Sequence, residues 1–300
     1  MSSPTIIVGY DGSPEAEQAA RWAFSEAERT RAAVELVYAW AWPAYLPATP
    51  MVPGSSIWPD TSVEAAIDTM MADAVAVARR SHPSCPITGV IEHGPPAVVL
   101  RDRAKDAQLL VVGGRSHGAI AGLLLGSVAS AIAAHAPCSV IVCRGGEQAF
   151  DNRPVVVGLD DSERAASAAR FALDQAAARG VAVRAVRAWM PPPDPWIGSH
   201  FVNRAEIAKT EHASLRDQLA GLREDFPGVP VTAEAVIGHP RRVLTDAAQH
   251  GQLIVVAARG RGGFHGLRLG SVSHHLLLHS PCTVAVLRDP PAPRDLDDVS

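Results

Sequence analysis

Two glycine-rich segments of this chain have the composition of a loop that binds phosphate. The first runs from Gly113 to Ser127 as Gly-Gly-Arg-Ser-His-Gly-Ala-Ile-Ala-Gly-Leu-Leu-Leu-Gly-Ser, and the second runs from Ala257 to Ser271. Both end in Gly-Ser, where the following residues predict a helix. Glycine lets a backbone approach a ligand closely, and a helix N-terminus offers free N–H groups at the positive end of its dipole. We therefore expect two phosphate-binding loops.

An aspartate follows each of two similar apolar runs: Asp11 in Ile-Val-Gly-Tyr-Asp and Asp160 in Val-Val-Gly-Leu-Asp. A carboxylate at the carboxyl end of a parallel strand can accept hydrogen bonds from a ribose or an adenine. The aspartates could instead cap a helix, but Ser13 and Ser162 fit that role better, which leaves both aspartates free for a ligand. Neither run is followed by G-x-x-x-x-G-K-[ST] or G-x-G-x-x-G, so P-loop and dinucleotide-binding interpretations both fail.

A different functional class is suggested by Gly114-Arg-Ser-His-Gly118, which matches the nucleophile-elbow pattern G-x-S-x-G and follows an apolar run. The alternative function is therefore a serine hydrolase that uses Ser116. An elbow needs its helix to start directly after the serine, whereas here the helix is expected only from Ser127. The equivalent position in the second segment is Gly260, which has no nucleophile. Both points favour binding over hydrolysis.

Histidines and arginines offer two further kinds of site. His275 and His279 are four residues apart and could hold a metal on one helix face, but only His279 recurs, as His135. Both recurring histidines end the last helix of their half, where they can complement the helix dipole, so we expect no metal site. The run Arg259-Gly-Arg-Gly-Gly resembles an RNA-binding RGG box, but one occurrence inside a folded unit favours the phosphate-loop interpretation.

The composition restricts the class of protein. The chain has 300 residues, 47% hydrophobic and 19% charged, with a formal net charge of −4. These values predict two globular domains and argue against nucleic acid as a partner. No apolar run is long enough to cross a membrane and the N-terminus has no leader pattern, so we expect a cytoplasmic protein without a membrane partner. The cysteines lie in or beside apolar runs without a C-x-x-C pair and are expected in the core: Cys85, Cys138, Cys143 and Cys282.

The elements that must position these residues occur twice. Gly9 matches Gly158, 149 positions later, and Leu125-Gly-Ser-Val128 matches Leu269-Gly-Ser-Val272, 144 positions later. The duplication predicts one domain over 1–144, a second over 153–288 and a disordered tail over 289–300. Two proline-rich segments, 41–60 and 190–202, follow the second strand of each half and are expected to be surface loops.

Within each half, short Val/Ile/Leu runs alternate with longer Ala-rich stretches, which is typical of a doubly wound α/β fold with a parallel sheet. In the first half we expect strands over 5–9, 33–39, 87–92, 108–113 and 138–143, and helices over 14–31, 62–81, 96–106 and 127–135. The apolar edge strands 139–143 and 283–287 would be exposed in isolated domains. Pairing them with each other would join the halves as an internal pseudo-dimer.

These features together resemble the universal stress protein family in its tandem form. The resemblance is carried by Val8-Gly-Tyr-Asp-Gly-Ser13, by the glycine loop after the fourth strand and by Leu125-Gly-Ser-Val128. The resemblance covers about residues 4–144 and 153–288. In each half, the glycine loop approaches the family's ATP-binding signature, G-x2-G-x9-G-[ST]. The resemblance implies an adenine nucleotide alpha hydrolase-like fold with a five-stranded sheet in each half, ATP or AMP between strands one and four, and fifth strands that pair between domains.

The resemblance assigns nucleotide-binding positions in both halves. In the first half these are Gly9, Asp11, Ala39, Val112, Gly113, Gly126, Ser127 and Val128. In the second half they are Gly158, Asp160, Ala188, Gly260, Gly270, Ser271, Val272 and Ser273. Ala39 and Ala188 stand where the family's second strand touches adenine through its backbone.

Each half departs from the signature at one glycine. Ser116 replaces the second glycine of the first half, which would strain the loop if that position has a positive φ. Ala257 replaces the first glycine of the second half, where its methyl group would crowd a nucleotide. Because the second half keeps Gly260 and Gly270 at the phosphate end, we expect its site to be the better occupied.

The implied function is ATP binding by a universal stress protein that acts in stress response or growth regulation. The sequence leaves room for a Mg²⁺ ion with the nucleotide and for weak ATP hydrolysis, but no base is evident for fast catalysis, so we expect no enzyme. The alternatives are the serine hydrolase and a nucleotide-free structural or interaction member of the same family. A homodimer through the domain faces or the loops after the second strands stays open.

Overall fold

The computed structural model describes residues 4–40, 61–114, 125–144, 152–190, 204–260 and 269–288. Several predicted features lie outside these ranges. They are Ser116, the loop 41–60, all but the first residue of the segment 190–202, and the tail 289–300.

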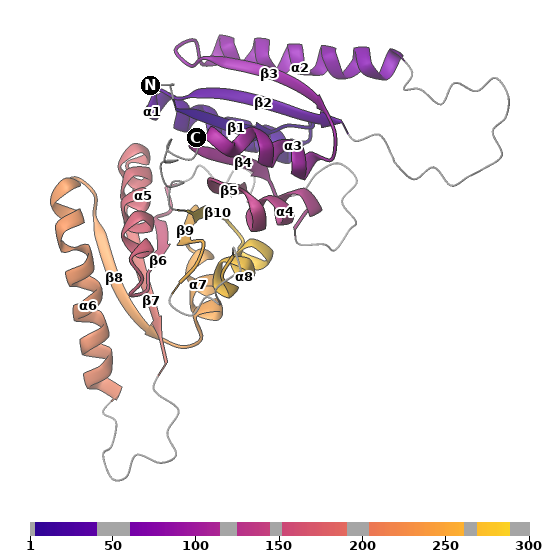
Figure 1. Ribbon diagram of the computed structural model, residues 1–300. Coiled ribbons are helices and arrows are strands. Elements are labelled where there is room, and N and C mark those ends of the chain that lie inside the picture. Colours follow the sequence, from indigo (N-terminus) through magenta and orange to yellow (C-terminus); the bar gives the residue numbers. More distant parts are fainter. Residues whose placement is uncertain are drawn as a thin grey trace, which may run out of the picture.

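One ten-stranded sheet runs through both halves of the described chain (Figure 1). The strands are β1 (Thr5–Gly9), β2 (Ala33–Trp40), β3 (Ile87–His93), β4 (Leu109–Gly113), β5 (Ser139–Cys143), β6 (Val155–Gly158), β7 (Val183–Trp189), β8 (Val231–Ile237), β9 (Leu253–Ala257) and β10 (Thr283–Leu287). Their order in the sheet is β3-β2-β1-β4-β5-β10-β9-β6-β7-β8. All neighbours within a half are parallel, so the predicted pair of doubly wound five-stranded sheets is confirmed.

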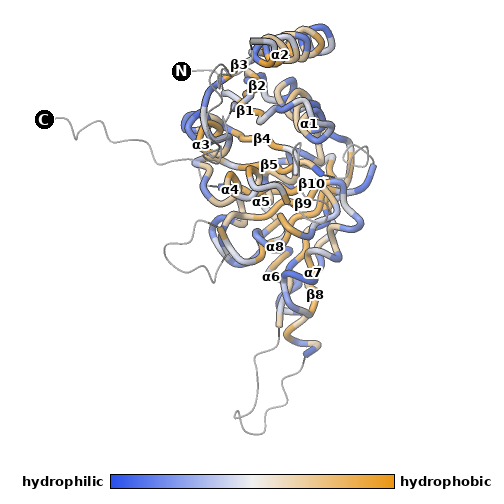
Figure 2. The backbone as a smooth tube through the Cα atoms, turned by 90° about the vertical axis from the view of Figure 1, so that its right-hand side faces the viewer, coloured by the Kyte–Doolittle hydropathy of each residue, from blue (hydrophilic) through white to orange (hydrophobic). Residues whose placement is uncertain are grey.

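Helices cover both faces of the sheet. One face carries α1 (Pro14–Thr30), α2 (Thr61–Ser81), α5 (Arg164–Arg179) and α6 (Arg204–Asp225). The opposite face carries α3 (Pro96–Arg103), α4 (Ser127–His135), α7 (Pro240–Ala248) and α8 (Ser271–His279). Each face has one apolar core that extends across both halves. The central strands β4, β5, β10 and β9 are hydrophobic along their length (Figure 2), as expected for strands buried on both faces.

The two halves join where β5 pairs with β10. This pairing is antiparallel, with Val140 opposite Val286 and Val142 opposite Val284. Both strands are buried along their whole length. The predicted pairing of the two edge strands is therefore confirmed, and it removes two apolar edges from solvent.

Two arginines at the ends of these strands reach across the junction. The guanidinium of Arg144 donates to the carbonyl oxygens of Leu278 at 3.2 Å and Ser280 at 3.3 Å, at the end of α8. Its counterpart Arg288 donates to the carbonyl oxygen of Ala133, near the end of α4, at 2.5 Å. Each half therefore supplies hydrogen-bond donors to carbonyl groups that the last turn of the other half's helix leaves unpaired.

A second contact between the halves involves equivalent positions of α1 and α5. Gln175 follows Glu26 by the same 149 positions that separate Gly9 from Gly158. Both side chains are buried, and the Gln175 Nε2 donates to the Glu26 Oε2 at 2.6 Å. Arg29 pairs with the other oxygen of Glu26 at 2.5 Å. The duplicated position thus carries one carboxylate and one amide where the halves meet.

The predicted element boundaries differ from the structure at several ends. The first helix stops at Thr30 because Arg31 adopts a left-handed conformation with φ of 56°. The helix predicted over 96–106 is two elements, α3 and a 3₁₀ turn over Ala104–Asp106. The fifth strand begins at Ser139, so Cys138 precedes it. The ends of these elements depend on cap and turn geometry, which the pattern of apolar residues does not indicate.

Candidate functional site

A cleft of about 420 Å³ opens at the carboxyl ends of β1 and β4. These strands are neighbours, but the chain leaves β1 toward β2 on one side and reaches β4 on the other, so the cleft lies at the topological switch point. Its volume falls within the range of about 300–1,000 Å³ that is usual for small-molecule sites. It is lined by Gly9, Tyr10, Asp11, Ala16, Val37, Tyr38, Ala39, Pro96, Leu100, Val112, Gly113, Gly126, Val128 and Ala129.

The structure brings most of the predicted positions of the first half together. Gly9, Asp11, Ala39, Val112, Gly113, Gly126 and Val128 all line the cleft. Ser127 begins α4 next to Gly126 but is not a lining residue. These placements are geometric, and the roles of the residues toward a ligand stay predictions.

Sequence reasoning missed one wall of the cleft. Pro96 and Leu100 reach it from α3, together with Ala129 from α4. Pro96 and Leu100 are four residues apart, which puts them on one face of a helix. The i, i+4 spacing within the predicted helix could therefore have identified them. Tyr10, which lies between the predicted Gly9 and Asp11, was missed because aromatic residues after a strand carry no distinct signal.

Two glycines that line the cleft allow neighbouring elements to pack closely against its strands. A β-carbon at Gly9 would lie 2.9 Å from Leu100 Cδ1, and one at Gly113 would lie 2.8 Å from the backbone carbon of Glu15. Gly126 is different, because its φ of −68° and ψ of 152° are open to any residue. Glycine is therefore not needed at 126 for the backbone conformation, and this residue lines the cleft at the start of α4.

The Asp11 carboxylate is fixed by its own turn. Its Oδ1 accepts from the Ser13 backbone N–H at 3.0 Å and from the Ser13 hydroxyl at 2.5 Å. The Ser13 Oγ also accepts from the Ala16 N–H at 3.1 Å and so caps α1, as predicted. Ser13 rather than Asp11 therefore caps the helix, as predicted, while the role of Asp11 toward a ligand stays a prediction.

Electrostatics keep the neighbouring phenol neutral. Burial raises the pKa of Tyr10, and the carboxylates of Glu17 and Asp11 raise it further. A neutral phenol beside Asp11 presents an apolar ring at the cleft, without a second negative charge. The described part of this cleft therefore offers one carboxylate, backbone groups and apolar walls.

The second half has the same arrangement of strand ends. Asp160 follows β6, and its Oδ2 lies so close to Gly260, after β9, that a β-carbon at Gly260 would collide with it. The carboxylate thus spans from the first strand of this half to its glycine loop, as expected for a residue at the switch point. Gly270 precedes α8 with φ of −76°, and its backbone N–H donates to the Ala258 carbonyl oxygen at 2.7 Å. Gly158 lies against Leu244, where a β-carbon would be 2.7 Å from Cδ1.

One prediction for the second half needs correction, and two predicted ligand residues make bonds of their own. Ser162 does not cap a helix, because α5 begins at Arg164 and its N-cap residue is Glu163, without a side-chain cap. The Asp160 Oδ1 accepts from the Ser162 backbone N–H at 3.0 Å and hydroxyl at 2.5 Å, and the role of Asp160 toward a ligand stays a prediction. Ser273 is buried, and its hydroxyl donates to the Ala257 carbonyl oxygen at 2.8 Å, so it ties α8 to the end of β9.

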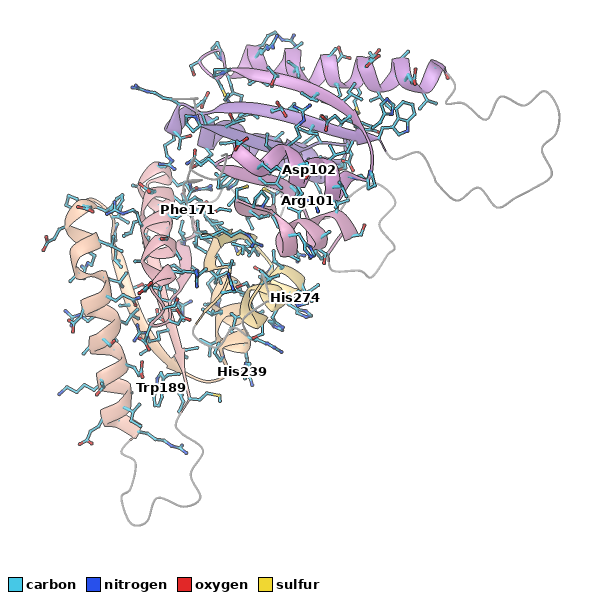
Figure 3. The ribbon with its side chains drawn as sticks, in the orientation of Figure 1. Arg101, Asp102, Phe171, Trp189, His239 and His274 are labelled. Atoms are coloured by element: carbon cyan, nitrogen blue, oxygen red, sulfur yellow. The ribbon has the colours of Figure 1, made fainter. Side chains whose placement is uncertain are left out.

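The remaining predicted positions of this half lie where their elements put them. Ala188 is the penultimate residue of β7 and pairs with Val236. Ser271 and Val272 open α8 directly after Gly270. Figure 3 shows Trp189, at the end of β7, and His239, just before α7, at the same edge of the sheet. The carboxyl ends of the strands and the starts of α7 and α8 therefore meet at this edge.

The other candidate chemistries find no support in the described residues. Within those ranges, no group of three or more His, Cys, Asp and Glu side chains is placed to hold a metal ion. The rings of His275 and His279 are in contact in a tilted arrangement, with centroids 4.4 Å apart and an interplanar angle of 37°. Burial raises the pKa values of Cys138 and Cys143 to about 12, so both thiols are core groups without a reactive thiolate. Ser116 lies outside the described residues, so the serine-hydrolase alternative is not tested.

The described helices also bear on the membrane question. Over the described ranges, no helix is both long and apolar enough to span a bilayer.

The fold and the cleft define a class: a tandem α/β protein whose two halves share one sheet, with described glycines at the switch point of each half. The model of the Universal stress protein family matches residues 3–144 and 151–288. The chain belongs to this family.

Known relatives span nearly the whole chain. Universal stress protein Rv2623 of Mycobacterium tuberculosis (strain ATCC 25618 / H37Rv) is 34% identical over 299 residues, covering 95% of this chain and 97% of that protein. Universal stress protein Rv1996 of the same strain is 32% identical over 312 residues, covering 96% of each. The crystal structure of a universal stress protein from Archaeoglobus fulgidus DSM 4304 matches with a TM-score of 0.65 at 16% identity, covering 95% of this chain and 96% of that one, which supports the fold.

Proposed function

We propose that this chain binds adenine nucleotides, with ATP as its main ligand, and acts in the cytoplasm in stress response or growth regulation. The observation that carries the proposal is the cleft of about 420 Å³ at the switch point of the first half. There Gly9 and Gly113 permit close approach, Asp11 presents a carboxylate, and Gly126 leads into the start of α4.

The parts of the cleft match the parts of an adenine nucleotide. The walls formed by Val37, Ala39 and Leu100 are apolar and suit the face of a purine. The Asp11 carboxylate suits a ribose hydroxyl, because a carboxylate only accepts hydrogen bonds. The N-terminus of α4 suits a phosphate, since its first N–H groups and dipole favour an anion. A Mg²⁺ ion could accompany the phosphates of ATP, which prefer that ion.

The proposed role is binding without fast turnover. Among the described residues that line the cleft, Asp11 is the only carboxylate, and its Oδ1 already accepts two hydrogen bonds from Ser13. Activation of a water toward a γ-phosphate needs a positioned base or orienting group. We therefore propose nucleotide-dependent signalling, with at most weak hydrolysis.

Thermal unfolding of the full chain with ATP and Mg²⁺, ADP or AMP tests the proposal. A ligand at about 100 times its Kd adds roughly 2.7 kcal/mol to the free energy of unfolding, which is a readily measured rise in Tm. Gly126→Val is the control, because the backbone at 126 accepts valine and, since this residue lines the cleft, we expect the added side chain to weaken binding in the first half. No rise in Tm with any of the three nucleotides at several millimolar would refute the proposal.

A homodimer through the domain faces or the loops after the second strands is a separate part of the proposal. Sedimentation of the chain with and without ATP measures it directly. A monomer under both conditions would refute the homodimer and leave nucleotide binding untouched.

A further inference from the structure

The turn that carries Asp160 is held from behind by a buried arginine. Arg187 lies on β7 with only 4% of its surface exposed. Its Nη1 approaches the Asp161 Oδ1 at 2.8 Å, and its Nη2 donates to the Gln218 Oε1 at 2.8 Å. Gln218 in turn donates from Nε2 to the carbonyl oxygen of Asp160 at 3.1 Å. One guanidinium therefore connects β7 and α6 to both aspartates of the turn.

Helix α6 supplies the rest of this arrangement. Ser214 Oγ accepts from Arg187 Nη1 at 3.0 Å, and Glu211 Oε2 lies 3.4 Å from the same nitrogen. We call Arg187, Asp161, Glu211, Ser214 and Gln218 the polar clamp. These partners match the charge of the buried guanidinium and the N–H groups of Nη1 and Nη2, while Nε is buried without a hydrogen-bond partner among the described residues, so the terminal nitrogens hold the side chain in position. The turn attached to it is held with it.

The clamp and the proposed nucleotide position of the second half, which we call the second cleft, lie on opposite faces of the sheet. The clamp lies on the face of α5 and α6, since α6 is its main source of partners. The proposed nucleotide position lies on the face of α7 and α8, where Leu244 of α7 packs against Gly158 and Ser273 of α8 is bonded to the end of β9. The α6 partners of Arg187 therefore reach the Asp160 turn from the face opposite α7 and α8.

The first half has no such clamp. The sequence offset of 149 at the strands puts Tyr38 opposite Arg187 and Gly12 opposite Asp161. Helices α2 and α6 end at Ser81 and Asp225, equally far before β3 and β8, which fixes an offset of 144 for the helix positions. The helix counterparts of Glu211, Ser214 and Gln218 are then Ile67, Met70 and Ala74.

These counterparts form an apolar contact instead. Tyr38, Ile67, Met70 and Ala74 all belong to the apolar core of this face. Gly12 has φ of +74°, and a β-carbon there would lie 2.6 Å from Met70 Sδ. The first turn is thus a left-handed glycine resting on a methionine, whereas the second turn is fixed by hydrogen bonds and ion pairs.

We propose that Arg187 is a positioning residue for the second cleft: with Gln218 it holds the Asp160 turn in place, so that nucleotide binding in the second cleft depends on the clamp and binding in the first cleft does not. This inference rests on the proposed function as far as nucleotide binding is concerned. Its structural part, the hold on the turn, can be measured in the protein without nucleotide.

Hydrogen exchange of the full chain without nucleotide is the first experiment. Arg187→Met and Gln218→Leu should each speed amide exchange across residues 159–163 by about tenfold, because the turn loses its attachment to β7 and α6. The strands β6 and β9 should keep their protection. Arg184→Met is the matched control, since Arg184 lies on the same strand and pairs with Glu234 at 2.8 Å, away from the turn.

The second experiment separates the two clefts by calorimetric titration with ATP. In a Gly126→Val background only the second cleft can fill, and there Arg187→Met and Gln218→Leu should weaken binding by about tenfold, equal to roughly 1.4 kcal/mol. In a Gly270→Val background only the first cleft can fill, and its affinity should not change. If Arg187→Met fails to fold, Gln218→Leu carries the test alone.

Each result decides a different statement. Unchanged exchange at 159–163, or exchange that rises evenly over the whole second half, overturns the clamp as a positioning device. Equal losses of affinity in both backgrounds overturn its selectivity for the second cleft. A chain without these substitutions that binds no adenine nucleotide refutes the proposed function, while the exchange data still decide whether Arg187 holds the turn.

Discussion

Replacement of Gln175 by glutamate tests how the two halves recognise each other. At present the Gln175 Nε2 donates to the Glu26 Oε2 at 2.6 Å, and both side chains are buried. Gln175→Glu keeps the size of the side chain and its contact with Arg179, whose Nη2 donates to Oε1 at 3.1 Å. It puts two carboxylates against each other at the junction of α1 and α5.

The size of the effect follows from two limits. Two like charges about 3 Å apart repel by roughly 5 kcal/mol at an effective dielectric constant of about 20. Protonation of one carboxyl avoids this repulsion, and for a glutamate with an ordinary pKa of about 4.3 that costs about 3.7 kcal/mol at pH 7. Arg29 and Arg179 offset part of either cost. We therefore expect Gln175→Glu to lower the free energy of unfolding by about 2–4 kcal/mol at pH 7.

Urea unfolding between pH 5 and pH 8 measures this effect. Gln175→Met is the matched control, because it removes the same hydrogen bond without adding a charge. The deficit of the glutamate variant should shrink by up to about 1.4 kcal/mol per pH unit on acidification, since protonation becomes easier. The double variant Glu26→Gln with Gln175→Glu should recover most of the loss, because it restores one carboxylate and one amide. Equal stability of the glutamate and methionine variants at every pH would refute the reasoning.

Three further predictions address other contacts. Arg144→Met should lower the free energy of unfolding in urea by about 1–3 kcal/mol, because carbonyl groups at the end of α8 lose their charged donor. The control Arg21→Met, at an exposed ion pair, should change the free energy of unfolding by less than about 0.5 kcal/mol. Similar values for both variants would contradict the bridging role of Arg144. Burial, and then His279 and Arg241, lower the pKa of His275 below its ordinary 6.5, so its contribution to stability is complete above pH 6.5 and is lost as the pH falls. In thermal melts, His275→Gln should therefore lose less stability than the unchanged chain between pH 7.5 and pH 5.5. The same dependence of Tm on pH in both proteins would disprove this. With pKa values of about 12, Cys138 and Cys143 should resist iodoacetamide at pH 8 in the folded chain and react after unfolding in urea. Mass spectrometry measures the modification. Modification of these cysteines in the folded chain would show that the thiols are not core groups.

Much of the fold could be predicted because the strands carry strong local signals. The run Thr5–Gly9 is apolar throughout and bounded by turn residues, and its strand has the predicted limits. The pairing of β5 with β10 followed from two apolar edges that would otherwise lie exposed. The duplication added weight, since each pattern occurs twice. Helix ends were predicted less well, because a left-handed residue such as Arg31 ends a helix without a change in hydrophobic periodicity.

The candidate site could be predicted only in part. The glycines and aspartates that follow strands belong to short segments, so their meeting at the switch point follows from topology. The wall formed by Pro96 and Leu100 depends on how α3 packs over β1, which a motif does not state. The bond between Ser13 and Asp11 was missed because a motif names residue types but not which acceptor a hydroxyl uses. Ser162 and Ser13 share a motif, yet only Ser13 caps a helix.

The two halves differ both in the glycine signature and in the polar clamp, which lies outside that signature. The glycine signature differs at Ser116 and Ala257, whereas the positions of the polar clamp differ as a set. Combining clamp residues of one half with their counterparts from the other half would be destabilising. An arginine facing Met70, or a tyrosine facing Glu211, would leave a charged group near the core without its partner. A shared sheet keeps the two backbones alike, so the halves can differ in function chiefly through such coupled side-chain sets.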